Sequence, residues 1–158
     1  MTATPKLHVE RVEDRTVPAN FGLPWLSSNV TVSCVPDGTP VDGVKSTLHA
    51  TLAANGLSPA VWQGEILRAF QTWAAVGNLN FGVVGDGGQA VGTAGRLQGD
   101  TRFGDIRISA RPLDQTVLAI TTPPGYTSDT RAGDIVFNSN FQFNGTTAAD
   151  KYDVVSAG

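Results

Sequence analysis

The chain of 158 residues contains two histidines and one cysteine, residue types that often bind zinc or act as nucleophiles. Neither His8 nor His49 has a second histidine three or four residues away, and a zinc site needs three or four ligands. Cys34 alternates with valines in a strand-like segment, which favours a buried thiol over a nucleophile. No G-x-S-x-G elbow is present. The sequence therefore shows no catalytic constellation and no zinc site built from histidine or cysteine.

Six aspartates in or beside glycine-rich loops are candidate ligands for a cation. They are Asp86, Asp100, Asp105, Asp114, Asp129 and Asp134. Calcium favours such flexible, oxygen-rich surroundings, but the chain has no D-x-[DN]-x-[DN]-G loop. Aspartates are also common in turns, where their side chains hydrogen-bond to the backbone. Calcium binding and a structural role in turns both fit this pattern.

Residues 85–90, G-D-G-G-Q-A, fit the G-x-G-x-x-A pattern of a dinucleotide-binding loop. That mechanism requires a helix to begin directly after the glycines, so that its N-terminus faces the pyrophosphate. Further glycines follow instead, at positions 92, 95 and 99. We therefore expect an irregular loop here and no dinucleotide site.

Composition narrows the class of protein. Hydrophobic residues make up 41% of the chain and charged residues 16%, and its mass of 16.5 kDa suits one domain. The net charge is −3, and the basic residues form no cationic stripe, so we expect no nucleic-acid partner. No apolar run approaches the roughly 20 residues of a membrane span. A single cysteine allows no intramolecular disulfide.

Hydrophobic periodicity predicts an α/β domain with one sheet. Expected strands are 29–35, 79–84, 105–110, 117–122 and 133–138, and expected helices are 45–54, 59–76 and a third that begins near residue 150. Helix 59–76 has the strongest signal, because Ser58 and Pro59 form a favourable start. Its aromatic and aliphatic side chains recur at helical spacing and should pack on the sheet through Trp62, Ile66, Phe70 and Trp73.

Six ordered segments carry a family resemblance. They are V-P-D-G-T-P-V (35–41), W-Q-G-E-I-L-R-A-F-Q-T-W-A (62–74), G-D-T-R-F-G-D-I-R-I-S-A (99–110), L-A-I-T-T-P-P-G (118–125), A-G-D-I-V-F-N (132–138) and Y-D-V-V-S-A-G (152–158). From Val30 to Gly158 the chain resembles the matrixin branch of the metzincin zinc peptidases, particularly planctomycete members.

The resemblance implies a zincin-like N-terminal subdomain within 29–158: a twisted five-stranded mixed sheet with helix 59–76 on one face. In this family a segment like 152–158 leads into H-E-x-x-H-x-x-G-x-x-H, which binds the catalytic zinc and supplies the glutamate that activates water. That motif is absent from this sequence. We therefore expect the chain to be truncated before the zinc helix and to be inactive by itself. The sheet face that this helix covers should then expose side chains such as Val30, Val32, Ile106, Ile108, Ile135 and Phe137.

The family also implies a substrate-binding strand. A strand like 117–122 is the antiparallel edge of the sheet, and extended polypeptide substrate pairs with its main chain. Leu118, Ala119, Ile120 and Thr121 are therefore the candidate substrate-binding residues. An ordinary edge strand without a ligand would have the same sequence pattern.

Two departures from the animal matrixins concern metals. At the position of Val136, the animal matrixins have a histidine that binds a structural zinc. At the position of Asn138, they have the first carboxylate that binds calcium. The loop that bears a further histidine is shortened to 111–117. These differences imply that the chain lacks the structural zinc, and they weaken the case for calcium.

Residues 1–28 are expected to be a leader and linker. The run V-E-D-R-T-V-P-A at 12–19 resembles a motif near the N-termini of planctomycete proteins thought to be exported, which implies an extracellular or cell-surface location. A disordered, charged leader is the alternative interpretation. For the whole chain two functions compete: part of a secreted zinc endopeptidase, or a non-catalytic surface or adhesion module derived from the same fold.

Overall fold

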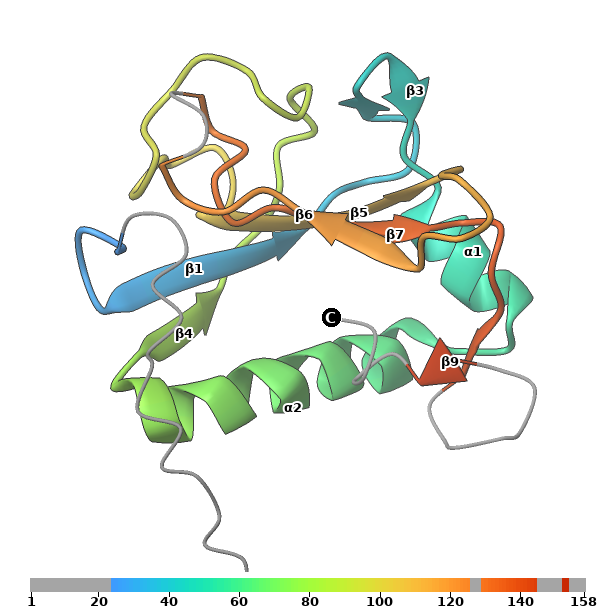
Figure 1. Ribbon diagram of the computed structural model, residues 1–158, viewed down its shortest axis with the longest axis horizontal. Coiled ribbons are helices and arrows are strands. Elements are labelled where there is room, and N and C mark those ends of the chain that lie inside the picture. The colour runs from blue at the N-terminus through green and yellow to red at the C-terminus, as the bar shows by residue number, and fades with distance from the viewer. Residues whose placement is uncertain (1–23, 126–128, 145–151, 154–158) are drawn as a thin grey trace, which may run out of the picture.

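The structure, a computed structural model, describes residues 24–125, 129–144 and 152–153. His8, the motif at 12–19 and most of the expected third helix lie outside the described residues. Figure 1 shows the described elements as one sheet with helices on one side and loops on the other.

Five strands form the main sheet, in the order β4-β1-β5-β7-β6. They are β1 (Asn29–Cys34), β4 (Asn80–Val83), β5 (Ile106–Arg111), β6 (Ala119–Thr121) and β7 (Ile135–Asn138). All neighbours are parallel except β6, which pairs antiparallel with β7. The predicted α/β class and the five-stranded mixed sheet are therefore confirmed, with β6 at one edge and β4 at the other.

Helix α2 (Pro59–Gly77) lies along one face of the sheet, as predicted for 59–76 (Figure 1). It begins after Ser58 with proline at its first position, where the missing N–H costs nothing. Asn78 ends it in the left-handed conformation. Its N-terminal half is buried through Trp62 and Ile66.

The shorter predicted helix begins later than expected. Helix α1 spans Leu48–Ala54, because Val44–Lys45 (β3) instead pairs antiparallel with Pro40–Val41 (β2) in a hairpin. The Asp37 carboxylate accepts hydrogen bonds from the backbone N–H groups of His49 and Ala50, at 2.9 and 2.8 Å. These bonds satisfy two of the free N–H groups at the helix start.

The expected start of a third helix is wrong where the structure describes it. Tyr152–Asp153 forms the short strand β9, which pairs in parallel with β8 (Phe143–Asn144). Phe143 is buried, and its ring meets that of Phe137 edge-on at 5.4 Å between centroids. Pairing with β8 therefore replaces a helical turn at 152–153.

The sheet face toward α2 carries the main hydrophobic core. Side chains that alternate along the strands point to this face, and most are fully buried: Val30, Val32, Ile106, Ile108 and Phe137. The expectation that these residues would be exposed is therefore wrong. Helices α1 and α2 and Phe143 pack against them, and only Ile135 among the residues named above is half-buried.

Trp73 departs from the predicted packing of α2. Its side chain is 66% exposed, whereas Trp62 is 1% exposed. Phe70 is still half-buried and contacts Phe81 of β4 with 4.9 Å between ring centroids. One turn later, Trp73 borders an open pocket between the helix and the sheet instead of filling it.

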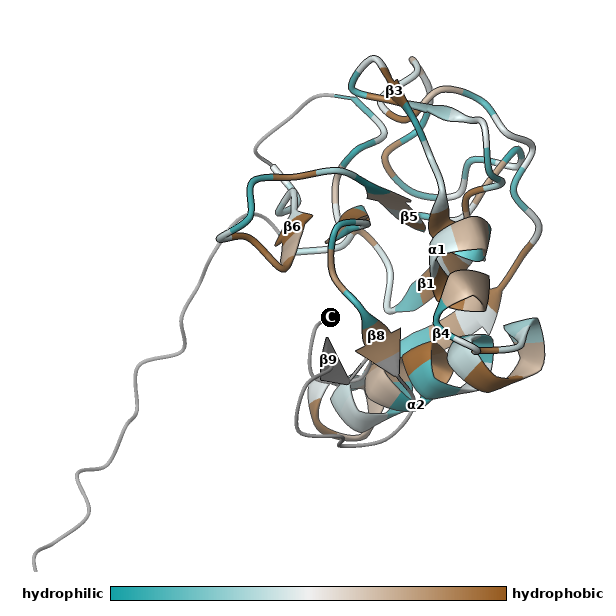
Figure 2. Ribbon diagram, turned by 90° about the vertical axis from the view of Figure 1, so that its right-hand side faces the viewer, coloured by the Kyte–Doolittle hydropathy of each residue, from teal (hydrophilic) through white to brown (hydrophobic). Residues whose placement is uncertain are grey.

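The opposite sheet face is polar and is covered by the glycine-rich segment between β4 and β5 and by the β2–β3 hairpin (Figure 2). Ser33, Arg107, Ser109 and Asn138 are all buried on this side. A smaller apolar cluster of Val35, Val41, Val91 and Val136 completes the layer. The domain therefore has an apolar core under α2 and a hydrogen-bonded interior under the loops.

Candidate functional site

Strand β6 is the edge that the family resemblance assigns to substrate. It pairs with β7 so that Ile120 lies opposite Val136. The Leu118 carbonyl accepts from the Asn138 N–H at 2.9 Å, and the Thr122 N–H donates to the Asp134 carbonyl at 3.3 Å. In an antiparallel ladder, residues that bond to the neighbouring strand alternate with residues that do not.

This alternation divides the four candidate residues into two pairs. Leu118 and Ile120 turn their N–H and C=O groups toward β7. Ala119 and Thr121 turn theirs outward, away from the sheet. Only Ala119 and Thr121 can therefore offer main-chain hydrogen bonds to an added strand, while Leu118 and Ile120 hold β6 in place.

Side chains on β6 also alternate between the two faces of the sheet. Ala119 lies opposite Phe137 and Thr121 opposite Ile135, so both occupy the face toward α2. Ile120 points to the other face and is 40% exposed. The residues that offer outward backbone groups thus also border the space between sheet and helix.

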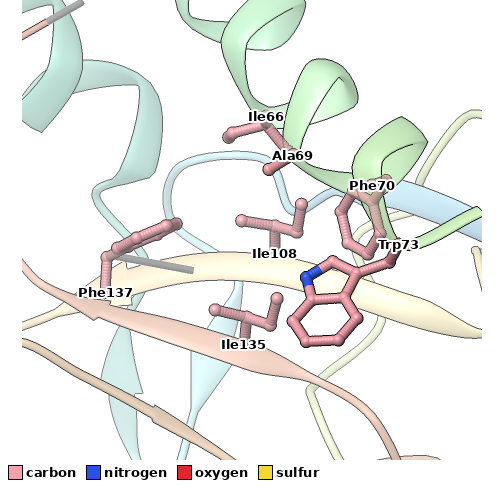
Figure 3. Close-up of a pocket in the computed structure, with 7 residues that line it drawn as sticks. All are labelled: Ile66, Ala69, Phe70, Trp73, Ile108, Ile135 and Phe137. Carbon is pink, nitrogen blue, oxygen red and sulfur yellow. The ribbon is translucent and has the colours of Figure 1, made fainter. Parts of the chain in front are cut away.

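An apolar pocket of about 110 Å³ occupies that space (Figure 3). Helix α2 contributes Ile66, Ala69, Phe70 and Trp73, β5 contributes Ile108, and β7 contributes Ile135 and Phe137. The two β7 residues are the cross-strand partners of Thr121 and Ala119. The pocket is therefore one strand away from the free edge, on the side to which Ala119 and Thr121 point.

Asn138 fixes the loop that leads into β6. Its side-chain nitrogen donates to the carbonyls of Asp114 and Val117 at 2.8 and 2.7 Å. Its side-chain oxygen accepts from the N–H groups of Leu113 and Asn140 at 3.0 and 3.1 Å. The amide thus uses all its usual hydrogen-bonding capacity, and it is fully buried. Sequence analysis named Asn138 as a departure from metal-binding relatives but missed this positioning role.

A buried ion pair holds the loop on the polar face. Arg107 donates from Nε and Nη2 to the Asp86 carboxylate at 2.9 and 2.8 Å, and both side chains are almost fully buried. Asp86 also accepts from Ser33 Oγ at 2.8 Å. Arg107 lies over the Phe103 ring, with 4.3 Å from the guanidinium carbon to the centroid. Sequence analysis did not predict the pair, although an arginine inside an alternating strand demands an acidic partner.

Cys34 and His49 border a second pocket, of about 240 Å³, between β1, β4 and the helices. Burial raises the pKa of the Cys34 thiol to about 11, and the nearby Asp86 charge adds to the rise. The thiol is therefore protonated at neutral pH and is a poor nucleophile. His49 meets the Trp62 ring edge-on at 5.2 Å between centroids, as a packed histidine.

Metal-binding side chains do not gather in the described residues. Within them, no group of three or more His, Cys, Asp or Glu side chains could hold a metal. The loop aspartates have internal partners instead: Asp100 pairs with Arg102, Asp129 with Arg131, and Asp114 with Thr116. Asp105 accepts from the backbone and hydroxyl of Thr31. We therefore derive no catalytic step through a metal.

The chain matches no protein-family model, and its sequence has no significant match among curated proteins. In the part of the chain that the structure describes, neither helix is long and apolar enough to cross a membrane.

Proposed function

We propose that the chain is the N-terminal part of a secreted zinc-dependent endopeptidase of matrixin type, in which β6 binds extended polypeptide substrate. The proposal combines the six sequence segments that resemble matrixins with the antiparallel position of β6. The zinc ligands would lie beyond residue 158, so the chain alone is expected to be inactive. Export to the cell surface or the medium, inferred from 12–19, is part of the same proposal.

One observation carries the binding role. Among the described residues, the outward main-chain donors and acceptors of Ala119 and Thr121 have no partner, and they lie beside an apolar pocket. An extended peptide can pair with these groups and place alternate side chains toward the pocket, since successive side chains point to opposite faces. Main-chain pairing would give affinity for many sequences, and the pocket would favour apolar side chains.

A pair of substitutions at Thr121 tests the binding role. Thr121→Pro removes the outward N–H but no ladder bond to β7, whereas Thr121→Val keeps the backbone unchanged. A peptic digest of casein serves as the probe, with binding measured by hydrogen exchange. We expect the digest to protect the Ala119 amide in the natural chain and in Thr121→Val, and this protection to be lost in Thr121→Pro, which has no amide proton at position 121. Equal protection in both variants would contradict pairing at β6.

The enzymatic part needs the polypeptide extended by the residues encoded after Gly158. We expect the extended protein to cleave casein and to lose this activity with a chelator, because the zinc ligands should lie in the added segment. Chelator-sensitive cleavage by the 158-residue chain itself would contradict the proposal. Peptide binding without cleavage by the extended protein would instead support the alternative, a non-catalytic surface or adhesion module.

A further inference from the structure

Strand β4 forms the second edge of the sheet. Like β6, it has backbone groups that face away from the other strands. The Asn80 N–H donates to the Ser28 carbonyl at 2.8 Å, and the Val84 N–H to the Val32 carbonyl at 3.0 Å. In the parallel register of β1 and β4, residues 80, 82 and 84 therefore face β1. Phe81 and Val83 turn their N–H and C=O groups outward.

In the part of the chain that the structure describes, this edge carries no charged residue and no proline. No charged residue occurs from Ala69 to Gly85, a run that covers the second half of α2 and all of β4. Natural edge strands are commonly guarded by lysine, proline or a bulge. Here Val83 is 63% exposed and Val84 41% exposed. The edge therefore presents both unpaired backbone groups and apolar side chains to solvent.

The last turns of α2 also expose apolar side chains. Trp73 and Val76, on its last turns, are 66% and 80% exposed. These turns lead directly into β4 (Figure 1). Trp73 borders the pocket that β5 and β7 line, so the uncharged apolar edge that could form a protein interface is β4 itself.

We propose that β4 pairs with β4 of a second copy of the chain. The two residues with outward backbone groups, Phe81 and Val83, lie one position before and one position after Gly82. In an antiparallel pair with a two-fold axis at Gly82, Phe81 of each copy faces Val83 of the other. Each such pair exchanges both N–H···O bonds. The two sheets then continue as one across the axis.

The side chains fit this arrangement. Gly82 meets its own copy at a non-hydrogen-bonded position, where two strands approach most closely, and it has no side chain to obstruct them. Phe81 lies on the face toward α2, since its ring contacts Phe70. Val83 shares that face, so each exposed Val83 is covered by Phe81 of the other copy. A charged foreign peptide would find no complementary charge on this edge, whereas a second copy satisfies every outward group.

Sedimentation analysis of the 158-residue chain over a wide concentration range tests the proposal. We expect the mass to rise from 16.5 kDa toward twice that value and then to stop. Val83→Lys should raise the dimer dissociation constant about tenfold or more, because it places like charges close together across the axis. Val44→Lys is the matched control, since Val44 is also an exposed strand valine but lies in the hairpin. It should leave the dimer unchanged.

Cross-linking tests the register without relying on the fold of Val83→Lys. A side chain at position 82 meets only Thr31 Cγ2 at 4.0 Å, so Gly82→Cys is sterically acceptable. In a Cys34→Ala background, Gly82→Cys should form a disulfide-linked dimer in air, and Val44→Cys should not. A chain that stays monomeric at all concentrations, or a Val83→Lys variant that associates as strongly as the natural chain, would overturn the proposal. So would equal cross-linking at positions 82 and 44.

Discussion

The side chain of Asn138 donates a 2.7 Å hydrogen bond to the carbonyl of Val117, two residues before β6 begins. The donor lies at the end of β7, the strand with which β6 pairs. The same amide therefore anchors both the loop that enters the edge strand and the strand beside it. This buried side chain therefore helps to position the candidate peptide-binding edge, together with the ladder bonds between β6 and β7.

Asn138→Asp tests this dependence. A carboxylate can still accept from the Leu113 and Asn140 N–H groups but cannot donate to the carbonyls of Asp114 and Val117. We expect the free energy of unfolding to fall by about 3 kcal/mol or more, because two buried carbonyls lose their donor and a buried carboxylate then lies against them. Chemical denaturation measures this loss, and hydrogen exchange should show faster exchange of the Ile120 amide. Asn140→Asp is the control, since that exposed side chain makes one 3.1 Å bond. Equal effects of the two changes would contradict the role assigned to Asn138.

Removing the charge of Asp86 should cost more stability than removing the charge of Asp100, whose arginine partner is partly exposed. Asp86→Asn leaves the Arg107 guanidinium buried without a counter-ion, which typically costs about 3–5 kcal/mol. Asp100→Asn disrupts the pair with Arg102, whose side chain is 39% exposed, and should change stability much less. Urea denaturation of both variants measures the difference. Similar stabilities would mean that the buried pair contributes no more than the exposed one.

Much of the scaffold could be predicted from sequence, because alternation and helical periodicity record which side chains share a face. Strand 29–35 and helix 59–76 agree with β1 and α2 to within one residue at each end. The edge position of β6 came from the family resemblance, since its three residues carry no pattern of their own. Periodicity also placed Trp73 on the inner face of α2 but could not tell where the sheet stops covering that face.

The polar interior could not be predicted for a different reason. Arg107 and Asp86 are 21 residues apart, and nothing local links them. Asn138 bonds to carbonyls 21 and 24 residues earlier, whose positions depend on how the loop folds. The outward direction of Ala119 and Thr121 likewise follows from the register with β7, which strand patterns alone do not specify.

Stability should depend on pH through Asp134. Burial raises the pKa of its carboxyl from 3.8 to about 7, against the lowering effect of the Arg107 backbone N–H that donates to Oδ1 at 2.8 Å. Oδ2 is buried and has no hydrogen-bond partner among the described residues. Between these pH values the folded chain holds a proton that the unfolded chain has lost. The stabilisation is complete below about pH 4 and disappears as the pH rises through 7.

Asp134→Asn should remove this part of the pH dependence, because an amide imitates the protonated carboxyl and does not titrate. Denaturation of both proteins at about pH 5 and about pH 8 measures the effect. The natural chain should lose stability between these values, by at most about 3 kcal/mol, and the variant should change much less. Equal slopes would show that Asp134 titrates normally in the folded protein.

Trp62 and Trp73 lie on the same helix, eleven positions apart, and should differ sharply in their contribution to stability. Trp62 is 1% exposed and contacts His49, so Trp62→Ala should cost about 3–5 kcal/mol by leaving a cavity in the core. Trp73 is 66% exposed, so Trp73→Ala in the monomer should cost less than about 1 kcal/mol. Denaturation at low protein concentration, followed by far-UV circular dichroism, gives both values, and the Trp73→Ala variant should lose the red-shifted part of the tryptophan emission. A large loss of stability from Trp73→Ala under these conditions would mean that this side chain is packed within the folded chain rather than open to solvent at the rim of the pocket.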